Sequence, residues 1–300
     1  MKNKISVIIP TYNRSDALEK CIYSIAEQKI LPSEVVVIDD GSLDADNIER
    51  LQKALEGSKT SFVYYKKDHT KERKGLSESK NKALTIAHNN VVCFLDDDVV
   101  LEKDFFASLQ KAWGREYDDT IYGIGGIIVN SRKRTGLEKT FHLLFGLGGS
   151  CTWDINDVGF QVWDDGIEKP EEGYYMHGGV SSYKKSIVQQ LGGFEVFKGG
   201  RTGLEDVELS ARAKQKGYKV IIDPSIRCAH FPSAQTREGA YVSGKKETAN
   251  RKTIYARYGK KGIMGRIHFV VAMMGWITRQ FLVGHIVKGV GMMVGLYARV

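Results

Sequence analysis

The sequence has 300 residues, the average composition of a globular protein and a formal net charge of +8. This length is enough for one large α/β domain or two small ones with a sizeable core. The four cysteines, Cys21, Cys93, Cys151 and Cys228, are far apart and form no Cys-x-x-Cys pair, which excludes a zinc knuckle and a disulfide framework. They predict buried free thiols in a reducing compartment.

The first predicted element is a buried parallel strand at Ile5 to Ile9. Its apolar residues are continuous and closed by Pro10, whereas a strand with one solvated face would alternate. The apolar part of Met1 to Pro10 is too short for a signal peptide, and we therefore expect a protein that is not secreted. Ser15 is expected to cap the helix that follows.

Strands and helices alternate through residues 1–100. Apolar patterns predict further strands at Val35 to Ile38, Phe62 to Tyr65 and Val91 to Leu95, and helices at Asp44 to Leu55 and Ser77 to His88. The order β-α-β-α-β-α-β predicts an α/β fold with a doubly wound, mostly parallel sheet. Ligands of such sheets bind outside the carboxyl ends of the strands. No Gly-x-Gly-x-x-Gly motif follows the first strand, so the sequence does not indicate that glycine amides bind a pyrophosphate as in dinucleotide-binding proteins.

Polar side chains follow three of these strands. They are Thr11, Tyr12 and Arg14 after the first, Asp39 and Asp40 after the second, and Asp96, Asp97 and Asp98 after the fourth. Three adjacent carboxylates repel one another unless a cation joins them. Oxygen ligands suit Mg²⁺ or Mn²⁺, whose remaining positions phosphate oxygens and waters can fill. The alternative is a polar strand end that caps the next helix.

The second half of the sequence is less regular. Its patterns predict helices at Phe105 to Trp113 and Tyr183 to Leu191, and strands at Tyr122 to Val129 and Tyr218 to Asp223. The stretch Ile226 to Phe231 carries His230. Residues 130–172 show no firm periodicity, and Trp153, Phe160 and Trp163 among Asp and Gly residues predict a surface loop region for an acceptor.

Glu205 and Asp206 open a further predicted helix, whose apolar face carries Leu204 and Val207. Carboxylates near a helix start are often only partners of the helix dipole, so this pair alone does not indicate catalysis. Similarly, His230 taken alone is more often a packed histidine than a metal ligand.

Four motifs closely resemble glycosyltransferase family 2. They are Ser6-Val-Ile-Ile-Pro-Thr-Tyr-Asn-Arg14, Val35-Val-Val-Ile-Asp-Asp-Gly-Ser42, Phe94-Leu-Asp-Asp-Asp98 and Gly203-Leu-Glu-Asp206. The resemblance covers roughly residues 4–232 and rests on their order and spacing. It implies a GT-A fold with a nucleotide-sugar-binding half at residues 1–100 and an acceptor-binding, catalytic half at 101–232. Residues 233–300 form a separate C-terminal segment.

The resemblance implies contacts to the donor. Asp39 would hydrogen-bond the nucleotide base, while Pro10, Thr11, Tyr12 and Arg14 would line the nucleotide pocket, and Asp96 and Asp97 would belong to the same nucleotide-sugar site. Ser79-Lys80-Asn81 stands where the family has Ala-Arg-Asn. Lys80 keeps the positive charge for a phosphate or base contact, but unlike arginine it cannot form two parallel hydrogen bonds to one partner.

The resemblance also implies a metal site and a base. Asp96 would approach the ribose or the metal, Asp98 would ligate Mn²⁺ or Mg²⁺ on the diphosphate, and His230 falls where some members place a further ligand. Asp206 would be the general base, and its neighbour Glu205 would help to hold the acceptor.

These roles predict a metal-dependent, inverting glycosyltransferase of the hexosyltransferase type. Direct displacement at the anomeric carbon needs a base for the acceptor hydroxyl and a cation for the departing diphosphate. The family favours UDP-sugars, with GDP and dTDP as alternatives. Two other functions are alternatives. One is a catalytically silent nucleotide-sugar-binding or scaffold protein of the same fold. The other is a nucleotidyltransferase, which should carry a Gly-rich basic loop that Pro10 to Asp16 does not provide.

The positive charge is concentrated in the C-terminal segment. Residues 231–300 contain twelve Lys or Arg and two Glu, a balance of +10, which leaves −2 for residues 1–230. A basic segment beside apolar stretches favours an anionic membrane surface as partner. Nucleic acid is disfavoured because no recognition motif is present.

The apolar stretches of this segment are too short to cross a membrane. No uninterrupted run reaches the roughly 18 to 20 residues of a spanning helix. We expect two short helices, bent around Thr278 or Gly284, that lie in the membrane interface; covering the catalytic domain or forming a dimer are the alternatives. The acceptor would then be a lipid-linked or cell-surface glycan, and the enzyme cytoplasmic and peripheral on the cytoplasmic face of the cell membrane.

Overall fold

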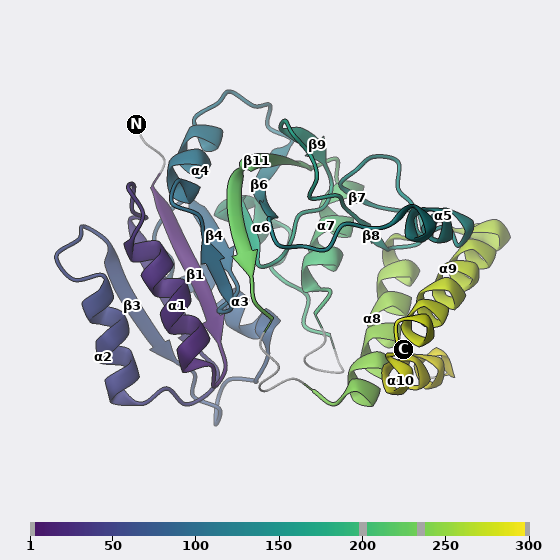
Figure 1. Cartoon of the computed structure of the whole chain (residues 1–300), viewed down its shortest axis with the longest axis horizontal. Coiled ribbons are helices and arrows are strands. Elements are labelled where there is room, and N and C mark those ends of the chain that lie inside the picture. The colour runs from purple at the N-terminus through teal and green to yellow at the C-terminus, as the bar shows by residue number, and fades with distance from the viewer. Residues whose placement is uncertain (1–3, 198–202, 233–237, 298–300) are drawn as a thin grey trace.

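A computed structural model describes residues 4–197, 203–232 and 238–297 (Figure 1). Its centre is a nine-stranded sheet in the order β3-β2-β1-β4-β10-β6-β11-β5, with β9 paired to β11. The strands are β1 (Ile5–Thr11), β2 (Glu34–Asp39), β3 (Ser61–Lys66), β4 (Val91–Leu95), β5 (Val99–Leu101), β6 (Ile121–Ile128), β9 (Glu171–Gly173), β10 (Val180–Lys184) and β11 (Lys219–His230). Strands β1 to β4, β6 and β11 run in one direction, and β5, β9 and β10 oppose them. The sheet is therefore mostly parallel, as predicted.

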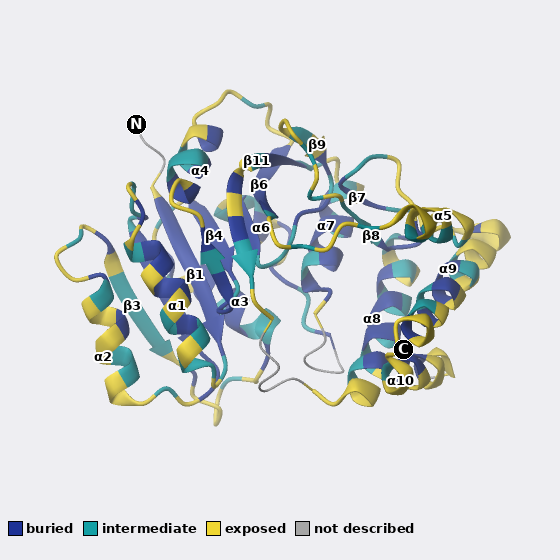
Figure 2. Ribbon diagram, viewed as in Figure 1, coloured by how far each residue is buried: buried dark blue, intermediate teal, exposed yellow. Residues whose placement is uncertain are grey.

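Helices cover both faces of this sheet. Helices α1 (Ser15–Ala26), α2 (Ala45–Ala54) and α4 (Phe105–Trp113) pack on one face, and α3 (Leu76–Ile86), α6 (Lys185–Gln190) and α7 (Glu205–Gln215) on the other. Along β1, Val7 and Ile9 belong to the first core and Ile8 to the second, because successive side chains of a strand point to opposite faces. Figure 2 shows the buried strands between these layers. The doubly wound α/β arrangement is confirmed.

Three local predictions were wrong. The helix predicted from Tyr183 begins only at Lys185. Residues 180–184 form a strand, β10, which pairs antiparallel with β4 and β6. The strand expected at Tyr218 to Asp223 is longer than predicted: β11 continues to His230, with an irregular register between Ile222 and Arg227. Ser15 is the first helical residue, and the cap position is Arg14, without a side-chain cap.

Residues 130–172 are more ordered than predicted. They contain α5 (Gly136–Leu144) and the short pair β7 (Asp154–Ile155) and β8 (Gln161–Val162). Helix α5 begins with a capping box between Thr135 and Glu138, a Thr-x-x-Glu signal that the sequence analysis overlooked. Trp153 and Phe160 are buried, so their assignment to a surface loop was wrong. Aromatic side chains of this size contribute more to stability inside a core than exposed to water.

The cysteine prediction holds for three of four residues. All four are free thiols; Cys21, Cys93 and Cys228 are buried, but Cys151 is only half-buried. Burial raises the pKa of the Cys93 and Cys228 thiols, in the latter case to about 12.

The C-terminal segment forms α8 (Ala240–Tyr258), α9 (Gly262–Leu282) and α10 (Ile286–Tyr297). Helix α8 packs against the sheet and its helices: Ile254 joins the second core, and the Tyr258 hydroxyl donates a 2.5 Å hydrogen bond to Glu208 of α7. Helix α10 packs along α8 (Figure 1). The chain breaks at Gly284, which has a φ of +79°, whereas Thr278 lies within α9. Among the helices within residues 4–197, 203–232 and 238–297, none has both the length and the hydrophobicity to span a bilayer.

Candidate active site

A pocket of about 1030 Å³ lies at the carboxyl ends of β1 and β4. One wall consists of residues that the motifs singled out: Pro10, Thr11, Tyr12, Arg14, Asp40, Asp96, Asp97, Asp98 and His230. The opposite wall comes from the C-terminal helices and includes Ala240, Ser243 and residues 284–288. The strand ends thus bring residues from four separate parts of the sequence to one cavity, as expected for a parallel sheet.

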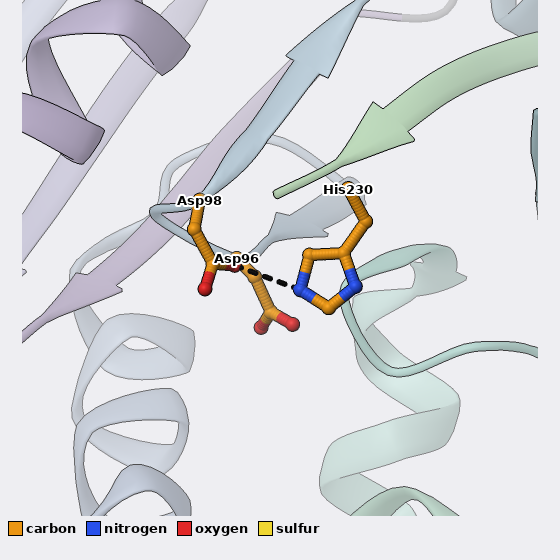
Figure 3. Close-up of side chains that lie close together, drawn as sticks. All are labelled: Asp96, Asp98 and His230. Carbon is orange, nitrogen blue, oxygen red and sulfur yellow. Dashed lines mark hydrogen bonds and ion pairs between the residues drawn. The ribbon is translucent and has the colours of Figure 1, made fainter. Parts of the chain in front are cut away.

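Asp96, Asp98 and His230 converge at the floor of this region (Figure 3). His230 ends β11, and its pairing with Val99 of β5 places it beside the Asp triplet. The Nε2 atom of His230 lies 3.0 Å from Oδ1 of Asp98, and one ligand atom from each residue lies within 4.8 Å of the others. Two carboxylates and one imidazole are a donor set that fits Mn²⁺ and is compatible with Mg²⁺.

Asp97 has different neighbours. Thr11 Oγ1 donates a 2.8 Å hydrogen bond to its Oδ2 atom, and Arg14 Nη1 lies 3.0 Å from its Oδ1 atom. The same Arg14 nitrogen is 3.4 Å from Asp98. Asp97 therefore joins the end of β4 to the loop after β1 and fixes the orientation of the triplet.

Burial raises the pKa of Asp96 and of Asp97, and the negative charge of Asp98 raises both further. The charge of Lys80 acts against this rise at Asp96, and the charge of Arg14 acts against it at Asp97. A carboxyl group whose pKa is raised in the folded state loses stabilising free energy as the pH rises through that raised value. A cation bound beside these crowded carboxyl groups would favour their ionised form and so lower their pKa.

We expect Mn²⁺ to raise the melting temperature at neutral pH. A ligand at about a hundredfold its Kd stabilises by roughly 2.7 kcal/mol, which in a protein of this size is a shift of about 5 °C. Differential scanning fluorimetry with Mn²⁺, Mg²⁺ and a chelator measures it. An equal shift in Asp98→Ala would mean that the ion binds elsewhere.

Asp206 lies in the first turn of α7, directly after Leu204, whose φ of +73° turns the chain into the helix. Its Oδ2 atom accepts hydrogen bonds from the Gly178 N–H and from the Tyr175 hydroxyl, both at 3.2 Å. Burial raises the pKa of Asp206, and the adjacent Glu205 raises it further. The Oδ1 atom of Asp206 accepts a third hydrogen bond, from the Val207 N–H at 2.8 Å. A carboxylate with a raised pKa that three donors hold in place suits the role of a general base.

Two adjacent glycines connect this carboxylate with the Asp96–Asp98–His230 cluster. A Cβ atom on Gly178 would lie 2.9 Å from Oδ2 of Asp206, and one on Gly179 would collide with the carboxylate of Asp96. Gly178 and Gly179 therefore let Asp96 and Asp206 approach the same turn from two sides. The sequence analysis noted no role for this pair, although two consecutive glycines before a strand are a signal of close approach.

Lys80 and Asp39 are placed differently from the other motif residues, and neither lines the pocket. The Lys80 Nζ atom lies 2.7 Å from Oε1 of Glu205, and the Lys80 side chain is enclosed by the rings of Phe94 and Phe194. Asp39 is fully buried and accepts hydrogen bonds from the N–H groups of Gly41 (2.7 Å) and Leu43 (3.0 Å) and from the Tyr64 hydroxyl (2.8 Å). In this structure Asp39 organises the loop after β2, and Lys80 holds Glu205.

Lys80→Met should destabilise the fold by about 3 to 5 kcal/mol, because it leaves Glu205 buried without its cation. Lys80 is only 1% exposed, so water cannot replace the lost partner. Urea unfolding measures the change.

Lys53→Met is the matched control, since the Lys53–Glu49 pair lies on the surface of α2. It should leave the free energy of unfolding unchanged. Equal midpoints for Lys80→Met and wild type would show that the buried pair is not needed for folding.

Comparisons with known proteins agree with this geometry. The sequence model of glycosyl transferase family 2 matches residues 6–162. A glucosyl-dolichyl phosphate glucuronosyltransferase from Haloferax volcanii is 25% identical over 238 residues, which cover 76% of this chain and 69% of that protein. A GalNAc(5)-diNAcBac-PP-undecaprenol β-1,3-glucosyltransferase from Campylobacter jejuni is 36% identical over 140 residues, or 45% of this chain and less than half, 44%, of that protein.

Solved structures share the fold. A mannosyltransferase from Pyrobaculum calidifontis in complex with GDP-Man and Mn²⁺ superposes with a TM-score of 0.60 at 19% identity, covering 99% of this chain and 81% of that one. TarS residues 1–349 from S. aureus, in complex with UDP-GlcNAc, give a TM-score of 0.60 at 14% identity, with 98% of this chain and 79% of that one covered. The large mixed sheet with its covering helices is thus a GT-A fold.

Proposed function

Because the chain belongs to glycosyl transferase family 2, we propose that it moves a sugar from a nucleotide-sugar donor to an acceptor hydroxyl, with inversion at the anomeric carbon. One observation carries the proposal: Asp206 lies against Gly178, and Asp96 of the Asp96–Asp98–His230 cluster lies against the next residue, Gly179, so the two groups are neighbours in one site. A base and an anion-stabilising site on opposite sides of a sugar are what a single displacement requires.

In this mechanism Asp206 removes the proton of the acceptor hydroxyl as that oxygen attacks the anomeric carbon. The Tyr175 hydroxyl and the Gly178 N–H hold the Asp206 carboxylate in place. Lys80 pairs with Glu205, so one positive charge stands beside the two neighbouring acids of α7. Attack from the side opposite the departing diphosphate inverts the anomeric configuration.

Asp96, Asp98 and His230 would hold Mn²⁺ or Mg²⁺, which when bound stabilises the negative charge of the leaving diphosphate. Tyr12 and Arg14 line the same pocket and would contact the nucleotide. The volume of about 1030 Å³ is at the upper end of small-molecule sites and accommodates a nucleotide sugar. We favour a UDP-sugar as donor, with GDP- and dTDP-sugars as alternatives.

For the acceptor we propose a lipid-linked glycan. The name of the relative from Haloferax volcanii includes the lipid carrier dolichyl phosphate, and the name of the relative from Campylobacter jejuni includes the lipid carrier undecaprenol. Two apolar residues of the C-terminal wall, Ile286 and Val287, face the pocket, which suits an acceptor with an apolar portion. We place the enzyme on the cytoplasmic face of the cell membrane, as a peripheral protein of glycan biosynthesis.

A donor panel tests the proposal. Hydrolysis or transfer of UDP-, GDP- and dTDP-sugars is measured with Mn²⁺, with Mg²⁺ and with chelator. Turnover of one donor that depends on the metal supports the proposal. Absence of turnover together with metal-independent nucleotide binding would instead favour a catalytically silent binding protein of the same fold.

A further inference from the structure

Three neighbouring helices, α5, α9 and α10, carry exposed apolar side chains, here together called the apolar face. It consists of Leu137, Leu143 and Leu144 of α5, Ile263, Met264, Ile267, Val270 and Met274 of α9, and Ile286, Val287, Val290, Met293 and Tyr297 of α10. Figure 2 shows these helices at one end of the molecule, with α9 between α5 and α10 and exposed residues on each of the three. Leu143 and Leu144 line a small pocket together with His268 and Val271 of α9, which makes α5 and α9 neighbours.

The apolar face is not the outer side of ordinary amphipathic helices. Helix α9 buries Ala272, Met273 and Ile277 on its inner side, yet its outer side carries Ile267, 48% exposed, and Met274, 57% exposed. A surface helix normally has polar residues on that side. Exposed apolar patches of this extent mark a binding surface.

Helix α10 shows the same pattern. Its inner side is Gly289, Gly291, Met292 and Gly295. Gly291 and Gly295 allow close packing on α8, and Gly289 allows close packing on Phe281 of α9. Val290 and Met293 on its outer side are 42% and 48% exposed. Both helices therefore have more apolar surface than the fold itself uses.

The charges around the face indicate which partner it fits. Residues 248–297 contain no Asp or Glu. Exposed basic residues accompany the apolar ones, among them Lys139 of α5, Lys261 before α9 and Arg266 on α9. A second copy of this face would bring positive charge against positive charge, whereas anionic lipid headgroups are complementary to it.

We infer that the apolar face docks on an anionic bilayer, with α9 and α10 lying in the interface and α5 beside them. Ile286 and Val287 belong both to this face and to the wall of the pocket. Docking therefore brings the pocket to the depth of the headgroups, where the reactive end of a lipid-linked acceptor lies. Docking rests on the face alone; only the link to the acceptor rests on the proposed function.

Cosedimentation of the full chain with liposomes tests the inference. The liposomes contain phosphatidylcholine with or without phosphatidylglycerol, and the variants are Ile267→Glu/Met274→Glu on α9 and Val290→Glu/Met293→Glu on α10. Wild type should bind the anionic liposomes, and either double variant should lower the partition coefficient at least about tenfold, since charges replace inserted apolar groups. Tyr23→Glu on α1, a residue 44% exposed at a distance from the face, is the matched control and should bind as wild type.

Two further measurements make the result unambiguous. Light scattering of the free proteins reports the oligomeric state: a wild-type dimer that both double variants dissociate would overturn the inference in favour of an interface between copies. The double variants should bind nucleotide in the presence of Mn²⁺ as well as wild type does. If wild type and the variants all fail to bind nucleotide, the proposed function is contradicted, and the inference about the bilayer is unaffected. No liposome binding by wild type, or equal binding by the double variants, would also overturn the inference.

Discussion

Asp98→Ala should lower kcat/KM for donor turnover about a thousandfold. Asp98 is one of two carboxylates in the cluster, and its Oδ1 atom lies 3.0 Å from His230. Its removal leaves one carboxylate, Asp96, and the His230 imidazole, which weakens the binding of a hard divalent ion. Loss of several kcal/mol of charge stabilisation at the departing diphosphate corresponds to a rate factor of this order. Steady-state turnover with a range of Mn²⁺ concentrations measures the effect.

Asp104→Ala is the control for this experiment, because Asp104 is an exposed carboxylate that pairs with Lys29 outside the pocket. It should keep the activity of wild type. If Asp98→Ala retains most of its turnover at every Mn²⁺ concentration, the cluster at the end of β4 is not the site where the donor diphosphate is stabilised.

Asp206→Asn should lower kcat by roughly 10²- to 10⁴-fold and leave the donor affinity unchanged. The amide keeps the shape of the carboxylate and can still accept hydrogen bonds from Gly178 and Tyr175, but it cannot take a proton. Asp118→Asn, in the loop before β6, is the control. A fall in donor affinity of the same size as the fall in kcat would contradict the assignment of Asp206 as the base.

The pH profile gives an independent check on Asp206. Burial, followed by the charge of Glu205, raises its pKa above the usual value of 3.8. Only the deprotonated form accepts a proton, so wild-type kcat should fall as the pH drops through this raised value. The residual activity of Asp206→Asn should lack that acidic limb.

Local patterns were sufficient to predict the first half of the fold. Continuous apolar runs identified β1, β2 and β4, and helical spacing identified α4 at its observed bounds. Strand β10 was missed because Val-Ser-Ser-Tyr has no alternation: it lies in the middle of the sheet, and Ser181 and Ser182 are buried. The Ser182 hydroxyl donates to the Ile124 carbonyl at 2.6 Å, so its polarity is satisfied inside the core.

The candidate site was predictable where a motif is local and unpredictable where distant segments meet. The Asp triplet and His230 converge as the resemblance implied, through β5 and β11. The Lys80–Glu205 pair joins residues 125 positions apart, and no pattern in either segment indicates it. The role of Gly178 and Gly179 likewise depends on how α7 approaches β4.

Composition predicted the basic and apolar character of the C-terminal segment but not how its helices pack on the rest of the protein. Arg251 of α8 is buried, lies over the rings of Phe160 and Trp276, and pairs with Glu247 at 3.2 Å. This cluster ties α8 and α9 to the loop at β8. One side of the helices thus covers the catalytic unit, which was the alternative considered, while their apolar face remains exposed.

The central claim is that the Asp96–Asp98–His230 cluster holds the metal through which the donor diphosphate binds. Isothermal titration calorimetry of UDP, GDP and dTDP, with Mn²⁺ and with chelator, on wild type and Asp98→Ala tests it most directly. We predict that at least one nucleotide binds wild type in Mn²⁺ and that chelator and Asp98→Ala each remove most of that affinity. Equal affinity with Mn²⁺ and with chelator would contradict the claim.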